Sequence, residues 1–95
     1  MTYADLQEAL RVLGLGERAT LKEIKTRHRE LVKRHHPDAG VTDDPDTIRQ
    51  VNASYKIITD YVSGYRFSFA ENEFYEQNPE ARILMQFADD PLWGK

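Results

Sequence analysis

Apolar residues recur every three or four positions in two neighbouring segments, and this spacing is typical of amphipathic helices. In residues 21–35 the apolar side carries Leu21, Ile24, His28, Leu31, Val32 and His35. In residues 45–62 the apolar side carries Ile48, Val51, Tyr55, Ile58 and Val62. Two such faces joined by a loop pack well against each other as antiparallel helices. The sequence therefore predicts an all-α fold organised around a helical hairpin.

The loop between these two helices begins with His36-Pro37-Asp38. Pro37 has no backbone donor and restricts the residue before it, so the preceding helix should end at or just before His36. The rest of the loop, up to residue 46, contains a glycine and several aspartates, which are turn-forming residues. Side chains at the start of such a loop are exposed and can meet a partner.

Capping residues mark three further helix boundaries. Thr2 can cap a short first helix over residues 3–13, and Gly14 suits the left-handed turn that ends it. Thr20 and Glu23 have the three-residue spacing of a capping box at the start of the second helix. The first helix would present an apolar face made of Leu6, Ala9, Leu10 and Leu13.

Residues 66–95 form a C-terminal extension that contains many aromatic residues. At its beginning, aromatic and polar residues alternate, which indicates an extended chain around Tyr65, Phe67 and Phe69. Pro79 follows an asparagine, as at a helix start, so one further helix is expected over about residues 81–88. Exposed apolar surface is usually covered. We therefore expect two regions, residues 1–65 and an extension, residues 66–95, that docks on the first.

The charged residues of the second helix separate into two sides. One side pairs acids with bases at i,i+4 spacing, Glu23 with Arg27 and Glu30 with Arg34, as on a solvated face. The adjacent stripe contains only cations, which are Lys22, Lys25, Arg29 and Lys33. Like charges one turn apart repel, so this stripe suits an acidic partner, whose approach it would steer.

No arrangement of residues predicts catalysis, a metal site or a cofactor. His36 and Asp38 could form an acid–base pair, but no nucleophile, oxyanion donor or pocket accompanies them. His28 and His35 lie seven residues apart on one helix face and would need added carboxylates to bind zinc. The loop aspartates lack the glutamate that ends a twelve-residue calcium loop. The chain has no cysteine, which excludes disulfides and thiolate chemistry.

Charge and apolar run lengths disfavour nucleic-acid and membrane partners. The 95-residue chain has a net charge of −3, which argues against nucleic-acid binding even though the cation stripe could contact phosphates. No apolar stretch approaches the roughly 20 residues that span a bilayer. The N-terminus lacks the basic start and apolar run of a signal peptide. We therefore expect a cytoplasmic protein.

Four stretches follow one another in a specific order. They are Leu13-Gly14-Leu15, residues 19–25, residues 29–38 ending in His-Pro-Asp, and residues 51–58 with the pattern Asn-x-x-Tyr. This order resembles the J-domain of DnaJ-type co-chaperones over residues 3–62. A bare His-Pro-Asp would be weak evidence, whereas the tripeptide at the end of a basic helix, between these flanking stretches, is specific.

The resemblance implies a binding module that docks on a DnaK-type chaperone and stimulates its ATP hydrolysis, and not an enzyme. It implies that Asp38 contacts an arginine of the chaperone. Basic positions of the second helix that face the chaperone are matched by Lys25, Arg29 and Arg34. Together with the rest of the stripe, the predicted partner-binding residues are His36, Pro37, Asp38, Lys22, Lys25, Arg29, Lys33 and Arg34. The matched core residues are Leu10, Ile24, Leu31, Tyr55 and Ile58.

The sequence departs from the family pattern at three places. Ala9-Leu10 replaces a tyrosine pair, and residues 61–66 replace a short basic fourth helix. His28 replaces an exposed tyrosine, and its role stays open between the core edge and the contact surface. The Gly/Phe-rich linker and the zinc modules of full-length DnaJ proteins have no counterpart in these residues. A second interpretation is therefore a J-like adaptor that binds a client or another protein through residues 66–95.

Overall fold

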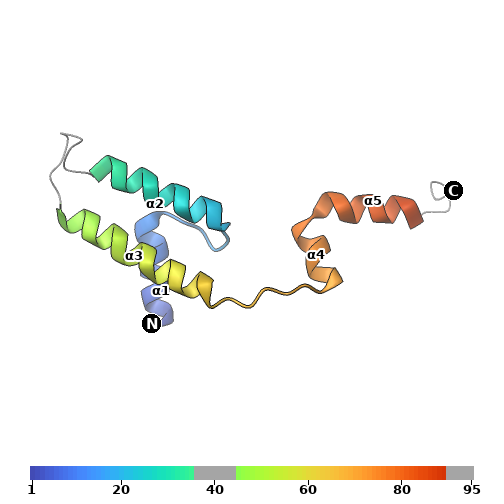
Figure 1. The fold of residues 1–95 in the computed structure, drawn as a ribbon, viewed down its shortest axis with the longest axis horizontal. Coiled ribbons are helices and arrows are strands. Elements are labelled where there is room, and N and C mark those ends of the chain that lie inside the picture. Colours follow the sequence, from blue (N-terminus) through green and yellow to red (C-terminus); the bar gives the residue numbers. More distant parts are fainter. Residues whose placement is uncertain (36–44, 90–95) are drawn as a thin grey trace. The chain divides into compact units, whose positions relative to one another are not determined.

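The computed structural model describes residues 1–35 and 45–89, which within these ranges contain helices and no strands. The helices are α1 (Tyr3–Leu13), α2 (Leu21–His35), α3 (Pro45–Ser63), α4 (Glu71–Gln77) and α5 (Pro79–Asp89) (Figure 1). The contacts within the chain divide it into two units, Met1–Tyr65 and Arg66–Lys95. The predicted all-α fold class is confirmed. Within the described ranges, no helix has the length and apolar character needed to cross a bilayer.

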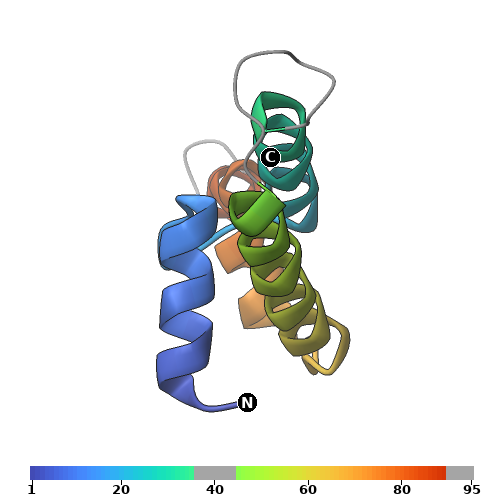
Figure 2. The same ribbon diagram turned by 90° about the vertical axis from the view of Figure 1, so that its left-hand side faces the viewer.

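In the unit Met1–Tyr65, α2 and α3 form an antiparallel hairpin, and α1 packs mainly against α3 (Figure 1, Figure 2). The three helices share one buried core, which consists of Ala9, Leu13, Ile24, Leu31, Val51 and Ile58. Half-buried residues that pack around this core are Leu6, Leu10, Val12, Leu15, Val32, Tyr55, Ile57 and Val62. The core comes from the apolar faces that the three- and four-residue spacing predicts, so the hairpin is confirmed.

Reciprocal hydrogen bonds fix the starts of α1 and α2. The Asp5 backbone N–H donates to Thr2 Oγ1 at 3.1 Å, and the Thr2 backbone N–H donates to Asp5 Oδ2 at 2.9 Å. Thr20 and Glu23 form the same pair of bonds, each 3.1 Å long. The backbone donors of Thr2 and Thr20 hold the pKa of the Asp5 and Glu23 carboxyls below their ordinary values. Both predicted helix starts are confirmed.

The corner between α1 and α2 is closed by a glycine and an arginine. Gly14 adopts a left-handed conformation with φ of 69°, as predicted for a helix stop. Arg27 Nε donates to the Leu13 carbonyl oxygen at 2.8 Å, so a side chain of α2 satisfies the end of α1. A Cβ at Gly14 would lie 3.1 Å from Arg27 Nη2, which leaves little room for a larger residue.

Arg27 differs from its predicted role on the solvated side of α2. Its guanidinium pairs with Glu30 at 3.2 Å, whereas the Glu23 carboxylate is bonded to Thr20 in the capping box. The predicted Glu23–Arg27 pair is thus replaced by an i,i+3 pair. The physical reason is competition, because the backbone donor of Thr20 engages Glu23 and the Leu13 carbonyl engages Arg27.

The unit Arg66–Lys95 contains two helices where the sequence predicts one. α5 was predicted over about residues 81–88 and runs from Pro79 to Asp89, whereas α4 was not predicted. α4 has seven residues and begins without a side-chain cap at Ala70, so neither periodicity nor capping indicates it. Asn78 Nδ2 donates to the Phe74 carbonyl oxygen at 2.9 Å and covers the end of α4. No side chain of residues 66–88 is buried.

Replacing Arg27 by methionine should lower the free energy of unfolding by about 1–2 kcal/mol, because the Leu13 carbonyl oxygen would lose its donor. Urea denaturation measures this change. Arg29→Met is the matched control, since Arg29 is an exposed arginine two residues away on the same helix. The control should change stability by less than about 0.5 kcal/mol. Equal losses in the two variants would contradict the capping role of Arg27.

The Glu23 cap should make stability depend on pH. Because its pKa is lowered in the folded state, the carboxylate adds stability above its unfolded pKa, and this is lost as pH falls through the folded pKa. The free energy of unfolding should therefore fall between about pH 5 and pH 3, and fall less in Glu23→Gln. Glu17→Gln removes a nearby acid outside the cap and serves as the control. Denaturation curves that fall equally in all three proteins would contradict this assignment.

Candidate docking surface

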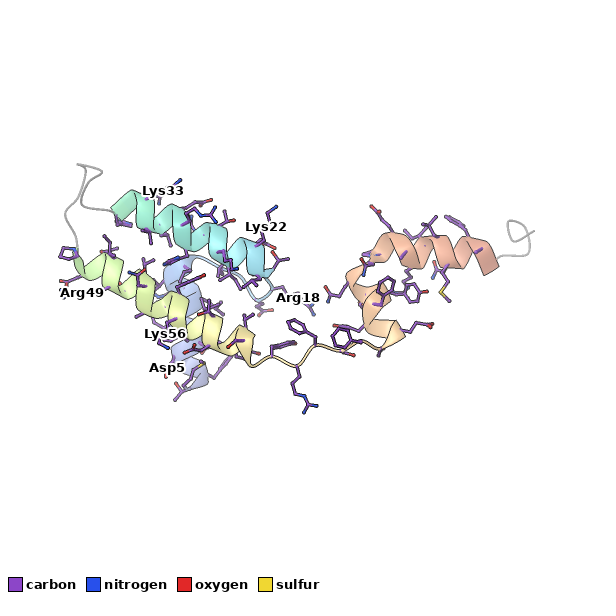
Figure 3. All side chains as sticks on the ribbon, viewed as in Figure 1. Asp5, Arg18, Lys22, Lys33, Arg49 and Lys56 are labelled. Carbon is purple, nitrogen blue, oxygen red and sulfur yellow. The ribbon has the colours of Figure 1, made fainter. Side chains whose placement is uncertain are left out.

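The five cations predicted to bind a partner all lie on α2 and are all exposed. Three of them, Lys25, Arg29 and Lys33, surround one hollow on the hairpin. Lys22 borders a different hollow, and Figure 3 shows it at the opposite end of α2 from Lys33. Within the described part of the chain, none of these five cations has an ion-pair partner. The structure thus divides the predicted stripe into a group of three and a separate Lys22.

The hollow beside the three cations is formed by α2 and α3 together. It has a volume of about 340 Å³ and is open to solvent. Its walls are mostly apolar, and its lining residues are Lys25, His28, Arg29, Val32, Lys33 and Tyr55. The hollow therefore combines three cations with apolar and aromatic lining residues.

His28, which lines this hollow, contacts two residues of α3. Its ring stacks on the Tyr55 ring, with 3.8 Å between the centroids and 9° between the planes. His28 Nε2 lies 2.8 Å from Asn52 Oδ1, and since an amide oxygen only accepts, the histidine nitrogen donates. His28 is half-buried. The residue thus lies at the core edge and also lines the exposed hollow, and a role in partner contact stays a prediction.

A second hollow lies on the other flank of α2 and differs in charge. It has a volume of about 300 Å³ and is lined by Leu15, Lys22, Glu23, Thr26, Arg27 and Glu30. Two of its charges form the Arg27–Glu30 pair, so this flank is partly neutralised. The contrast makes the hollow between α2 and α3 the better candidate for an acidic partner.

The predicted loop residues His36, Pro37 and Asp38 lie outside the described residues. They follow His35, the last residue of α2, whose side chain is half-buried. Arg34, the remaining predicted cation, lies next to His35 and lines neither hollow.

The exposed surface of α2 offers a partner both charge and apolar contact area. Across residues 1–35 and 45–88, no group of three or more histidine, aspartate or glutamate side chains is placed to hold a metal ion. The exposed cations can attract carboxylates, and the apolar lining residues Val32 and Tyr55 can contact an apolar group. Both are contributions to affinity for a protein surface.

Two contacts of α2 were missed by the sequence analysis. The periodicity placed His28 on the apolar side, but did not indicate its bond to Asn52, which is 24 residues away. The i,i+4 charge pattern placed Arg27 on the solvated side, and no sequence pattern indicated that it would reach the end of α1. The stacking of His28 was detectable in part, because both His28 and Tyr55 lie on the predicted apolar faces.

The sequence of the chain is similar to those of several known proteins. The chain is similar to the chaperone protein DnaJ of Ureaplasma parvum, with 37% identity over 49 residues, covering 52% of this chain and 13% of that protein. It is similar to the DnaJ protein homolog XDJ1 of Saccharomyces cerevisiae, with 39% identity over 54 residues, covering 52% and 12%. The DnaJ-like protein MG002 homolog of Mycoplasma pneumoniae is 40% identical over 78 residues, covering 76% and 23%.

These matches concern a small part of each relative, since the chain spans less than a quarter of the length of these three proteins. The share of this chain matched by the Mycoplasma protein is larger than residues 1–63, so that similarity continues beyond α3. No solved structure matched at a significant level.

The model of the DnaJ domain family matches residues 8–63, which include most of α1, all of α2 and α3, and the His36-Pro37-Asp38 sequence. This is more than half of the 95-residue chain. The chain therefore belongs to the DnaJ domain family.

Proposed function

We propose that this chain is a DnaJ-type co-chaperone that docks on a DnaK-type chaperone in the cytoplasm and stimulates its ATP hydrolysis. The observation that carries this proposal is the group of three exposed cations, Lys25, Arg29 and Lys33, on the helix that leads into His36-Pro37-Asp38. Membership of the DnaJ domain family supports it. In this function the chain is a binding module and the chaperone performs the chemistry.

The cations of α2 would act first, during the encounter. Charges that have no ion-pair partner among the described residues can attract an acidic surface, and such steering raises the association rate in a salt-dependent way. The hairpin is rigid enough to serve as a mount, because α2 and α3 share the buried residues Ile24, Leu31 and Ile58. Docking through α2 would then place Asp38 against the chaperone, where the resemblance implies a contact with an arginine.

A second candidate function is that of an adaptor, in which the extension captures another protein. The observation that favours it is the exposed apolar surface of α4 and α5, which includes Phe74 at 53%, Ile83 at 49% and Leu84 at 69% exposure. α4 also carries the acidic residues Glu71, Glu73 and Glu76, of which Glu76 pairs with Arg82 of α5. The two functions are compatible, because they use different units of the chain.

The proposed chaperone function is tested by two variants in a single-turnover ATPase assay with a purified DnaK-type chaperone. Arg29→Ala should weaken apparent affinity about fivefold at low salt, with a smaller loss at high salt, because an exposed charge is screened. Asp38→Asn should abolish stimulation even at saturating concentration.

Lys56→Ala is the matched control, since Lys56 is an exposed cation on α3 that is paired with Asp60 at 3.1 Å. The control should stimulate like the unmodified chain. Full stimulation by Asp38→Asn would overturn the proposed function.

The extension is tested by ending the chain at Tyr65. The three helices should still form, because every buried apolar residue in the described part of the chain lies in α1, α2 or α3. ATPase stimulation should persist, while capture of a protein by the extension should be lost. That the extension docks on residues 1–65 stays a prediction, and it requires the truncated chain to show a lower free energy of unfolding. An equal value for both chains would contradict docking.

A further inference from the structure

In the described part of the extension, the helices α4 and α5 have no core of their own (Figure 1). Across residues 66–88, no side chain is buried. Helices of seven and eleven residues are marginal in water unless other parts of a protein pack against them. We infer that α4 and α5 bind a protein segment that presents apolar side chains next to lysines or arginines. The inference rests on the second candidate function, in which the extension captures a protein, and adds the chemistry of the captured segment.

α5 is apolar on more than half of its circumference. Ile83, Leu84 and Met85 follow one another, and successive residues of a helix are rotated by roughly 100°, so these three side chains cannot all face α4. All three are exposed, Leu84 at 69%, although α4 and α5 pack against each other. Phe74 of α4 is exposed as well. An exposed apolar surface to which several side chains contribute is typical of a protein-binding site.

The net charge of the chain belongs to the extension. Residues 66–95 carry six acidic and three basic side chains, whereas residues 1–65 carry ten of each. Because the extension is acidic, its encounter with a basic segment is favoured and its encounter with an acidic segment is opposed. The apolar side chains alone would not select a partner, whereas the charge of this unit does.

Glu80 combines charge with the apolar surface of α5. It lies three and four residues before Ile83 and Leu84, so these three side chains share one side of the helix. Among the described residues, Glu80 has no ion-pair partner, whereas Glu76 pairs with Arg82 at 3.7 Å. A segment that packed against Ile83 and Leu84 would bring its own neighbouring side chains close to Glu80. A lysine or arginine there would pair with the carboxylate, and an acid would be repelled.

Charge disfavours three other occupants of this surface. Two copies of the extension would bring two acidic units together, and like charges repel. Helices that lie on membrane surfaces carry lysines and arginines on their polar side, whereas the arginine of α5, Arg82, is paired with Glu76. Residues 1–65 of the same chain have no net charge. A basic segment of another protein is the occupant that the charges favour.

The experiment measures binding of the full chain to a labelled synthetic peptide, in which leucines at helical spacing form one side and lysines lie on both flanks. Fluorescence anisotropy gives the dissociation constant. Two matched peptides separate the contributions: one has glutamates in place of the lysines, and the other has serines in place of the leucines. Both should bind at least about tenfold more weakly than the leucine–lysine peptide. An equal affinity for either matched peptide would overturn the inference.

Variants of the chain test whether the peptide binds to α5. Leu84→Ser should weaken binding of the leucine–lysine peptide about tenfold at low and at high salt, because an apolar contact is not screened. Glu80→Gln should weaken it about threefold at low salt and less at high salt. Leu21→Ser and Glu17→Gln are the matched controls, since they change an exposed leucine and an exposed acid of unit Met1–Tyr65. Controls that bind as weakly as the α5 variants would contradict this site.

Two measurements on the chain alone test the competing occupants. Sedimentation velocity should show a monomer at the concentrations used for binding. A dimer that Leu84→Ser dissociates would assign the surface to a second copy. Urea denaturation should give the same free energy of unfolding for Leu84→Ser and the unmodified chain, whereas a loss would show that Leu84 is covered within the chain. Either of these contrary results overturns the inference.

The outcomes also separate this inference from the proposed functions. Leu84→Ser should stimulate the chaperone ATPase like the unmodified chain, because Leu84 lies outside residues 8–63, which match the DnaJ domain family. If stimulation is normal and the leucine–lysine peptide does not bind, only the inference fails. If the glutamate peptide binds most tightly and Leu84→Ser weakens it, the extension captures acidic segments, so the adaptor function stands and the inference fails. If Asp38→Asn stimulates fully while the leucine–lysine peptide binds as expected, the chaperone function fails and the inference stands.

Discussion

The buried contact between α2 and α3 is the constraint on which the exposed features of unit Met1–Tyr65 depend. Ile24 and Leu31 of α2 meet Val51 and Ile58 of α3, and Leu13 of α1 completes the same core. Because one side of α2 is committed to this contact, its rotation about its own axis is fixed. The cations Lys25 and Arg29 are thereby held at the surface, where a partner can reach them.

Two arginines on α2 lie in different surroundings. Arg27 points to the end of α1 and satisfies the Leu13 carbonyl, so its charge is used within the fold. Arg29, two residues later, faces the hollow and has no ion-pair partner in the described part of the chain. In a helix, residues two positions apart point in nearly opposite directions. Charge alone therefore does not identify a docking residue; its direction on the helix does.

The surface formed in this way is suited to recognition. Its cations Lys25, Arg29 and Lys33 would attract and orient an acidic partner from a distance. The extension presents a second, acidic and apolar surface, so the chain carries two surfaces of opposite charge on its two units.

The sequence by itself determined where α1 and α2 begin, because the capping pairs Thr2–Asp5 and Thr20–Glu23 join residues only three positions apart. It also determined the hairpin, because the apolar faces that form the core repeat at helical spacing. The short α4 was not predicted, since it lacks a side-chain cap and a full apolar period. Only the tertiary structure decided the roles of Arg27 and His28. Their partners lie 14 and 24 residues away, at positions that become neighbours only when the three helices pack.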